Sequence, residues 1–288
     1  MNELQNNPKI LVKRDGALGD VIMTTPIIRE IFQDYDGLCE LYVQTRCPDV
    51  FRNSPYVTGI NPTNQLLYDA IYDLNLSYEK NPKIHTINAY KWSVFGNIEL
   101  NDYSLDLFES ASDKNKILSL EYKNYIVIHM RKQPSWPSRD LPTEFYKNLI
   151  GKILEETDAT IIQVGAGQDL AFDGSVRLVN CINKFTIHEI KCLIDDARAY
   201  IGVDTGLLHI ASCTNTPTIA FFTSCRSEYR KPLKDSIKFI PIEANISCYG
   251  CQQDNPPPCT VFTCRRGSID CINTFDVLDT IIKLHSIL

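Results

Sequence analysis

Two glycines and an aspartate form the first group of residues that could perform chemistry. Gly16, Gly19 and Asp20 follow the apolar run 9–13 and open a helix-like pattern. The glycines permit a tight turn, and free N–H groups at the helix start could hold an anion or an acceptor oxygen. Asp20 could accept a proton from an attacking hydroxyl group, or it could simply cap the helix. The turn lacks the Gly-x-Gly-x-x-Gly spacing, so it is not a dinucleotide-binding fingerprint.

A second group of residues follows the apolar run 199–203 and opens another helical pattern: Asp204, Thr205, Gly206 and, one turn later, His209. Open α/β sheets bind ligands where a strand ends and the next helix begins. Backbone N–H groups of this turn could bind a pyrophosphate, the Thr205 hydroxyl could add a hydrogen bond, and His209 could add a charge-assisted one. The alternative is an aspartate cap followed by a buried histidine.

Three cations, Arg131, Lys132 and Arg139, lie in a segment that leaves the apolar run 125–129. A loop in this position would face the same crevice as residues 204–209, since both follow strands of one expected parallel sheet. Cations there could neutralise the charge that builds up on a departing nucleotide. An ordinary solvated basic loop is the alternative.

Five of the 11 cysteines crowd into one segment near the carboxyl end of the sequence: Cys248, Cys251, Cys259, Cys264 and Cys271. The first two form a Cys-x-x-Cys pair, a spacing that is typical of structural metal sites. A tetrathiolate site would suit zinc or iron. Free reduced thiols are the alternative, and a disulfide framework fits less well because residues 1–9 contain no apolar signal core.

These groups need elements to position them, and the hydrophobic periodicity predicts alternating strands and helices. Strands are expected at 9–13, 38–45, 57–60, 69–76, 125–129, 160–164, 199–203 and 218–222, and helices at 20–35, 48–53, 88–100, 143–156, 186–197, 206–213 and 276–287. This alternation predicts an α/β fold with parallel sheets and right-handed crossovers. The polar stretch 102–116 suggests a junction between a domain at 1–118 and a domain at 119–288.

Composition narrows the classes of function. The chain has 288 residues and a formal net charge of −6, and it has no block of basic residues, so binding to duplex nucleic acid is not expected. No run of about 18 apolar residues is present, which predicts no membrane span. Together with the polar amino-terminal residues, this predicts a cytoplasmic protein, with peripheral contact to a membrane left open.

The order of the motifs resembles glycosyltransferase family 9, the ADP-heptose:lipopolysaccharide heptosyltransferase family. The resemblance covers nearly the whole chain, and it rests on residues 10–20, 24–29, 139–149, 203–217 and 221–222. It implies a GT-B fold, in which two Rossmann-like domains face a cleft, with the donor in the carboxyl-terminal domain and the acceptor in the amino-terminal one. It also implies an inverting transfer without a catalytic metal.

Carried over residue by residue, the resemblance makes Asp20 the base, with Gly16 and Gly19 in the acceptor-side loop. It assigns the donor phosphates to Asp204, Thr205, Gly206 and His209, assisted by Arg139, Lys132 and Arg131. Arg139 stands where relatives carry a cation before a Trp-Pro pair, whereas this chain continues Asp-Leu-Pro. The amino-terminal half is also shorter than usual in the family.

The cysteine segment resembles a cluster found in part of the same family, where some members that modify proteins bind iron. On that match Cys248, Cys251, Cys264 and Cys271 would be the ligands of a structural zinc or iron ion, and Cys259 would be spare.

The leading hypothesis is therefore a glycosyltransferase that uses a nucleotide-sugar donor, with heptose favoured by the resemblance and a surface glycan or a protein as acceptor. Two alternatives stay open from the sequence: a nucleotide-sugar epimerase on the same fold, and a non-catalytic nucleotide-sugar-binding protein.

Overall fold

The computed structural model describes residues 7–63, 67–234, 238–254 and 263–288, and the chain divides into two compact units, Met1–Phe108 and Glu109–Leu288. The strands are β1 (Lys9–Arg14), β2 (Glu40–Thr45), β3 (Gly59–Ile60), β4 (Ala70–Asp73), β5 (Tyr125–His129), β6 (Thr160–Val164), β7 (Leu178–Asn180), β8 (Ala199–Val203), β9 (Thr218–Phe222) and β10 (Phe239–Glu243). The α-helices are α1 (Leu18–Ile22), α2 (Thr25–Asp34), α3 (Ser77–Lys80), α4 (Thr86–Phe95), α5 (Ala111–Leu118), α6 (Thr143–Glu156), α7 (Ile187–Asp195), α8 (Gly206–Ala211) and α9 (Val277–His285). Short 3₁₀ helices are η1 (Pro48–Phe51), η2 (Pro137–Arg139), η3 (Ser227–Tyr229), η4 (Cys251–Gln253) and η5 (Asp270–Asn273).

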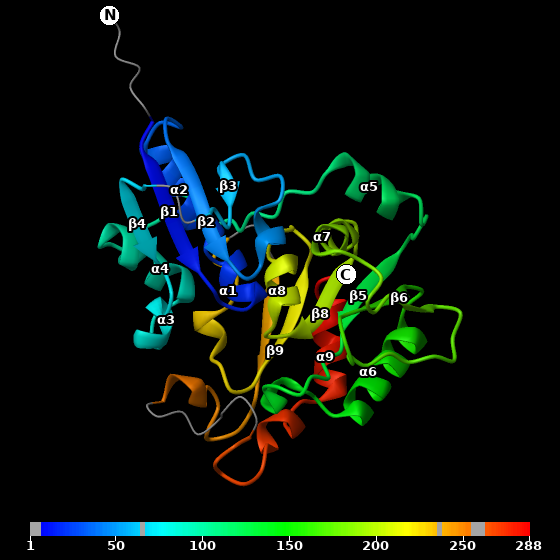
Figure 1. Cartoon of the computed structure of the whole chain (residues 1–288). Helices are drawn as coiled ribbons and strands as arrows, with labels where there is room; N and C mark the ends of the chain where they lie inside the picture. Colours follow the sequence, from blue (N-terminus) through cyan, green and yellow to red (C-terminus); the bar gives the residue numbers. More distant parts are fainter. Residues whose placement is uncertain (1–6, 64–66, 235–237, 255–262) are drawn as a thin grey trace, which may run out of the picture. The chain divides into compact units, whose positions relative to one another are not determined.

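The first unit contains a parallel sheet in the order β3-β2-β1-β4, with β1 in the interior (Figure 1). The single helix that the periodicity predicts over 20–35 is interrupted, and α1 and α2 replace it. Pro26 in the first turn of α2 explains the break, because proline cannot supply the backbone N–H that a continuous helix requires. The hydroxyl groups of Thr24 and Thr25 donate to the carbonyl oxygens of Val21 and Ile22 at 2.7 and 2.8 Å, which satisfies groups that the break exposes.

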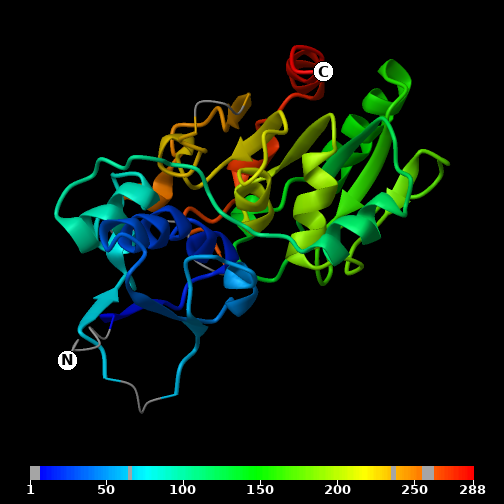
Figure 2. The ribbon, with the colours of Figure 1, turned by 90° about the horizontal axis from the view of Figure 1, so that it is seen from above.

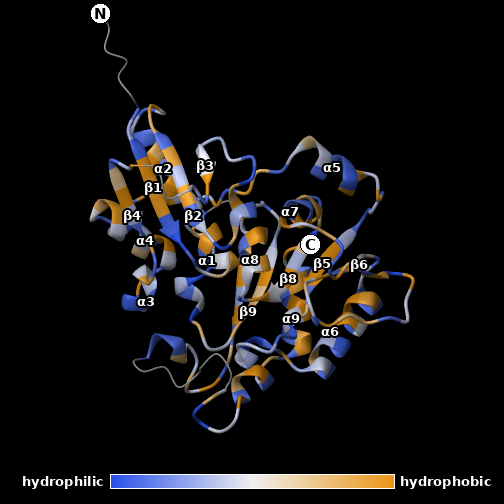
Figure 3. Ribbon diagram, viewed as in Figure 1, coloured by the Kyte–Doolittle hydropathy of each residue, from blue (hydrophilic) through white to orange (hydrophobic). Residues whose placement is uncertain are grey.

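The second unit contains a six-stranded parallel sheet in the order β10-β9-β8-β5-β6-β7. Numbered along the chain, this is the 3-2-1-4-5-6 order of doubly wound nucleotide-binding sheets. Strands β5, β8 and β9 are buried along their whole length, and their apolar character is visible in Figure 3. Helices α6 and α9 pack together on one face of the sheet, and α5, α7 and α8 cover the other (Figure 2).

These two sheets confirm the predicted α/β class with parallel strands. Among the described helices, none has the length and apolar character needed to cross a membrane.

The junction between the units differs from the expected polar connection, because residues 111–118 form α5. Ser110 caps this helix by accepting a hydrogen bond from the Asp113 N–H at 3.2 Å. Lys116 of α5 pairs with Glu189 of α7 at 2.8 Å. Helix α5 therefore belongs to the second unit, and the division at Phe108 lies before the boundary expected at 118/119.

Candidate active site

The strand order of the second unit reverses between β5 and β8, and the predicted donor turn lies at the carboxyl end of β8. His129 is the last residue of β5, and Asp204 and Thr205 directly follow β8. Thr205 is the N-cap of α8, and Gly206 is the first residue of that helix. Ligands of doubly wound sheets bind in the crevice that such a reversal creates.

Asp204 is a buried carboxylate with positive groups on several sides. Its Oδ2 lies 3.2 Å from Nη2 of Arg139, and its Oδ1 lies 4.0 Å from Nε2 of His209. Burial alone would raise the pKa of Asp204, but the charges of Arg139, Arg230 and His209 hold it below its usual value. Asp204 is therefore ionised at neutral pH, and side chains that can carry positive charge outnumber it.

The three predicted cations have different environments. Arg139 pairs with Asp204, and its guanidinium group lies 5.5 Å from the centre of the Trp136 ring. The guanidinium group of Arg131 instead donates within its own loop, to Asp140 and, at 3.1 Å, to the carbonyl oxygen of Trp136. The Lys132 side chain is exposed. Arg139 is thus the predicted cation that the structure brings to Asp204, while Arg131 stabilises the loop.

Sequence reasoning missed Arg230, His129 and Asp169. Arg230 follows η3, beyond the carboxyl end of β9, and its charge acts on Asp204. His129 Nε2 lies 3.1 Å from Asp169 Oδ2, and its Nδ1 lies 3.3 Å from Thr205 Oγ1. Their positions in the sequence could have indicated them, because each of these three residues ends a strand of the second sheet or follows one.

In the first unit, Asp20 is the third residue of α1 and lies just beyond β1. Its carboxylate accepts a hydrogen bond from the Ala17 N–H at 3.2 Å and lies 3.5 Å from Nη2 of Arg14. Arg14 is buried and also pairs with Glu79 at 2.8 Å. Asp20 therefore caps the helix by reaching back to its start, while its partly exposed carboxylate is held as an ion pair.

The two predicted glycines of this turn have different surroundings. A Cβ atom on Gly16 would lie 2.7 Å from Cβ of Asp20 and 2.8 Å from Nε of Arg14, so this position has no room for a side chain. Gly19 is buried within α1. Gly16 thus lets Asp20 and Arg14 approach the backbone closely.

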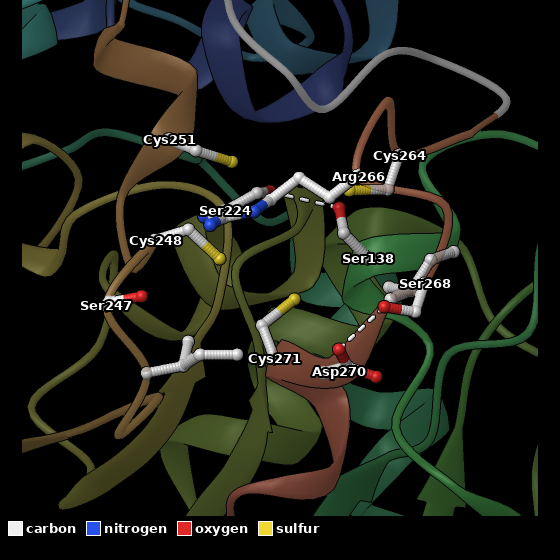
Figure 4. Close-up of a pocket in the computed structure, with 12 residues that line it drawn as sticks. Ser138, Ser224, Ser247, Cys248, Cys251, Cys264, Arg266, Ser268, Asp270 and Cys271 are labelled. Carbon is white, nitrogen blue, oxygen red and sulfur yellow. Dashed lines mark hydrogen bonds between the residues drawn. The ribbon is translucent and has the colours of Figure 1, made fainter.

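The four predicted metal ligands of the second unit line one cavity of about 280 Å³ (Figure 4). Cys251 opens η4 and Cys271 belongs to η5, so different segments contribute these thiols to the lining of the cavity. Ser138, Arg266 and Asp270 line the same cavity. Within the described residues no three His, Cys, Asp or Glu side chains form a group that could hold a metal ion, and Cys259 lies outside them.

Comparison with known proteins gives the family. The model described as "Glycosyltransferase family 9 (heptosyltransferase)" matches residues 92–257, which is more than half of the 288 residues. The chain belongs to glycosyltransferase family 9. This family 9 chain is 36% identical over 62 residues to lipooligosaccharide heptosyltransferase 2 of Haemophilus influenzae, a stretch covering 22% of this chain and 18% of that protein. A second protein of that organism is 28% identical over 151 residues, 46% of this chain and 43% of its own length. The alignments thus span less than half of these two relatives.

Solved structures agree with the GT-B fold. ADP-heptose lipopolysaccharide heptosyltransferase II of Escherichia coli matches with a TM-score of 0.66 at 16% identity, over 84% of this chain and 92% of that one. The iron-containing dodecameric glycosyltransferase TibC of enterotoxigenic E. coli matches with a TM-score of 0.69 at 14% identity, over 99% of this chain and 77% of that one. TibC has also been solved in complex with ADP-D-beta-D-heptose, and that structure matches with a TM-score of 0.66 at 16% identity, over 99% of this chain and 77% of that one.

Proposed function

We propose that this family 9 chain is a glycosyltransferase that moves a sugar from a nucleoside-diphosphate donor to a hydroxyl group of a glycan or a protein. The observation that carries the proposal is the cluster of Asp204, Arg139 and His209 at the carboxyl end of β8. A buried carboxylate that is outnumbered by side chains able to carry positive charge favours an anionic ligand such as a diphosphate. The Thr205 hydroxyl group and the Gly206 N–H would complete the phosphate contacts.

ADP-heptose is the donor that we propose. The complex of TibC with ADP-D-beta-D-heptose supports this choice. The acceptor would be either a surface glycan or a protein side chain, because both offer the hydroxyl group that the chemistry requires.

In the reaction that we propose, the acceptor oxygen attacks the anomeric carbon from the face opposite the nucleotide. The bond between that carbon and the diphosphate oxygen breaks, ADP leaves, and the configuration at the carbon inverts. Asp20 accepts the proton of the attacking hydroxyl group, a role open to its partly exposed carboxylate. Arg139 and His209 stabilise the charge of the departing diphosphate.

We also propose that Cys248, Cys251, Cys264 and Cys271 hold one structural iron or zinc ion. Four thiols around one cavity provide the soft ligands that either ion accepts in tetrahedral sites. The iron of the structural relative TibC supports iron as one of the two candidates. Binding would draw the four side chains together and link segments 248–251 and 264–271, and no step of the transfer requires the ion.

A donor assay tests the proposed activity and separates it from the alternatives. Purified protein is mixed with ADP-heptose, with and without candidate acceptors, and both free ADP and the sugar are measured. Release of ADP that depends on an acceptor supports a transferase. A changed sugar without transfer would identify an epimerase, and binding without any turnover would identify a non-catalytic binder; either result overturns the proposal.

A further inference from the structure

A chain of three hydrogen-bonded side chains connects the interior of the second unit to the proposed donor turn. Asp169 Oδ2 lies 3.1 Å from His129 Nε2, and His129 Nδ1 lies 3.3 Å from Thr205 Oγ1. The side chains of Asp169 and His129 are both only 4% exposed, whereas Thr205 is partly exposed. One end of the chain is therefore a buried carboxylate, and the other is a hydroxyl group within reach of a ligand.

The carboxylate end of this chain is fixed by several donors. Asp169 Oδ1 accepts hydrogen bonds from the Lys132 N–H at 2.8 Å and from Gln133 Nε2 at 2.7 Å, and Oδ2 accepts one from the Ala166 N–H at 2.9 Å. Burial alone would raise the pKa of Asp169, but His129 and these N–H groups lower it to about 2. At neutral pH the Asp169 carboxylate is therefore ionised and can accept hydrogen bonds but not donate them. His129 Nε2 must then carry the hydrogen of their contact.

The hydrogen on Nε2 leaves two states for the other ring nitrogen. In neutral His129, Nδ1 is an acceptor, and the Thr205 hydroxyl group donates its hydrogen to the ring. In protonated His129, Nδ1–H donates to Thr205 Oγ1 instead, and the hydroxyl hydrogen can turn toward an anion in place of the Val203 carbonyl oxygen, which lies 3.4 Å away. A diphosphate oxygen accepts hydrogen bonds, so it is bound better by the second state.

We infer that His129 is a positioning residue that orients the Thr205 hydroxyl group toward the donor diphosphate, and that diphosphate binding takes up a proton at His129. Asp169 holds the imidazole ring in place through the 3.1 Å contact with Nε2. The inference rests on the proposed function, because it assigns a role to two residues in the proposed donor site.

Three other ionisable groups interact with Asp169, and each keeps one protonation state over the relevant pH range. Arg131, in the loop after β5, interacts with Asp169 and stays protonated. Tyr146 of α6 and Tyr200 of β8 also interact with Asp169, and burial raises the pKa of both phenols far above neutrality, so they stay neutral. Within this group, the His129 imidazole is therefore the one whose protonation differs between the two hydrogen-bonded states.

Calorimetry with inorganic pyrophosphate tests the inference on the full chain. Titrations in two buffers of different ionisation enthalpy give the number of protons taken up on binding, for the parent protein and for His129→Gln. A control, His285→Gln, removes an exposed histidine of α9 that contacts Glu156 at 3.0 Å. All three proteins keep His209, so its titration and that of pyrophosphate cancel in the comparison.

We expect His285→Gln to bind pyrophosphate with the same affinity and the same proton uptake as the parent protein. His129→Gln should lose the proton uptake, and its affinity near pH 6 should fall about tenfold, with less change near pH 8. If His129→Gln does not fold, Thr205→Ser and Thr205→Val decide: serine should keep the proton uptake, and valine should lose it. Unchanged uptake in His129→Gln, equal uptake in the two Thr205 variants, or a parent protein that does not bind pyrophosphate would overturn the inference. A parent that shows His129-linked uptake but transfers no sugar would refute only the proposed function.

Discussion

Asp20 is the residue on which the proposed chemistry of the first unit depends. Asn at this position can still accept the hydrogen bond from the Ala17 N–H, so α1 should keep its cap. It cannot accept a proton. We expect Asp20→Asn to lower single-turnover transfer by about 10²- to 10⁴-fold, while the affinity for ADP-heptose stays close to that of the parent.

Asp15→Asn is the matched control for this experiment. Asp15 is an exposed carboxylate of the same turn, so the change removes the same charge from a neighbouring position. This variant should transfer sugar at nearly the parental rate. Parental transfer by Asp20→Asn would show that Asp20 is only a helix cap, and the base would then have to be another carboxylate of the first unit.

Asp169 links two loops between secondary-structure elements, the loop after β5 and the loop after β6. The stability that this link contributes should depend on pH. Because the folded state lowers the pKa of Asp169 to about 2, its contribution to stability is fully present above about pH 4 and is lost as the pH falls toward 2. Asp169→Asn should therefore lower the free energy of unfolding by roughly 2 kcal/mol at neutral pH, and by less at about pH 3.

Urea unfolding followed by circular dichroism measures this difference at each pH. Asp173→Asn is the control, since Asp173 is exposed and lies only a few residues further along the chain. It should leave the stability almost unchanged. A loss in Asp169→Asn that is equally large at every pH would mean that the side chain acts through packing rather than through its charge.

Strands and helices with a strong hydrophobic pattern could be predicted from the sequence, and those with a weak hydrophobic pattern could not. The buried strands β5, β6, β8 and β9 match their expected ranges, because their apolar runs are short, rich in β-branched residues and bounded by polar or turn residues. The edge strands β7 and β10 were missed, since each pairs on one side only and is less buried. Helix α5 was missed because its sequence is polar, and its position depends on packing against α7 and on the ion pair between Lys116 and Glu189.

The same distinction applies to the candidate site. The turn 204–206 could be found because a strand, a helix start and characteristic residue types coincide there. The contacts of Arg139, Arg230 and His129 depend on which strands are neighbours in space. Only the order of the strands in the sheet reveals that β5 lies beside β8.

For the molecule as a whole, the proposed metal site predicts the metal content of the purified protein and the effect of chelation on its stability. Freshly purified protein should contain about one iron or zinc per chain, and chelation should lower its melting temperature. Cys264→Ser should lower the metal content, whereas Cys39→Ser, a buried cysteine of the first unit, should not. Elemental analysis that finds no metal in protein never exposed to a chelator would contradict the proposed site.

The central claim for the whole molecule is that the donor diphosphate binds at the carboxyl end of the second sheet, and ADP affinity tests it most directly. Arg139→Gln removes a cation at that end, while Arg198→Gln removes one at the amino end of β8, where Arg198 contacts Asn124 at 2.9 Å. Calorimetry should show that Arg139→Gln binds ADP at least about tenfold more weakly than the parent, a difference of about 1.4 kcal/mol, and that Arg198→Gln binds it normally. Equal ADP affinity in a folded Arg139→Gln protein, or weaker binding in Arg198→Gln alone, would contradict the claim.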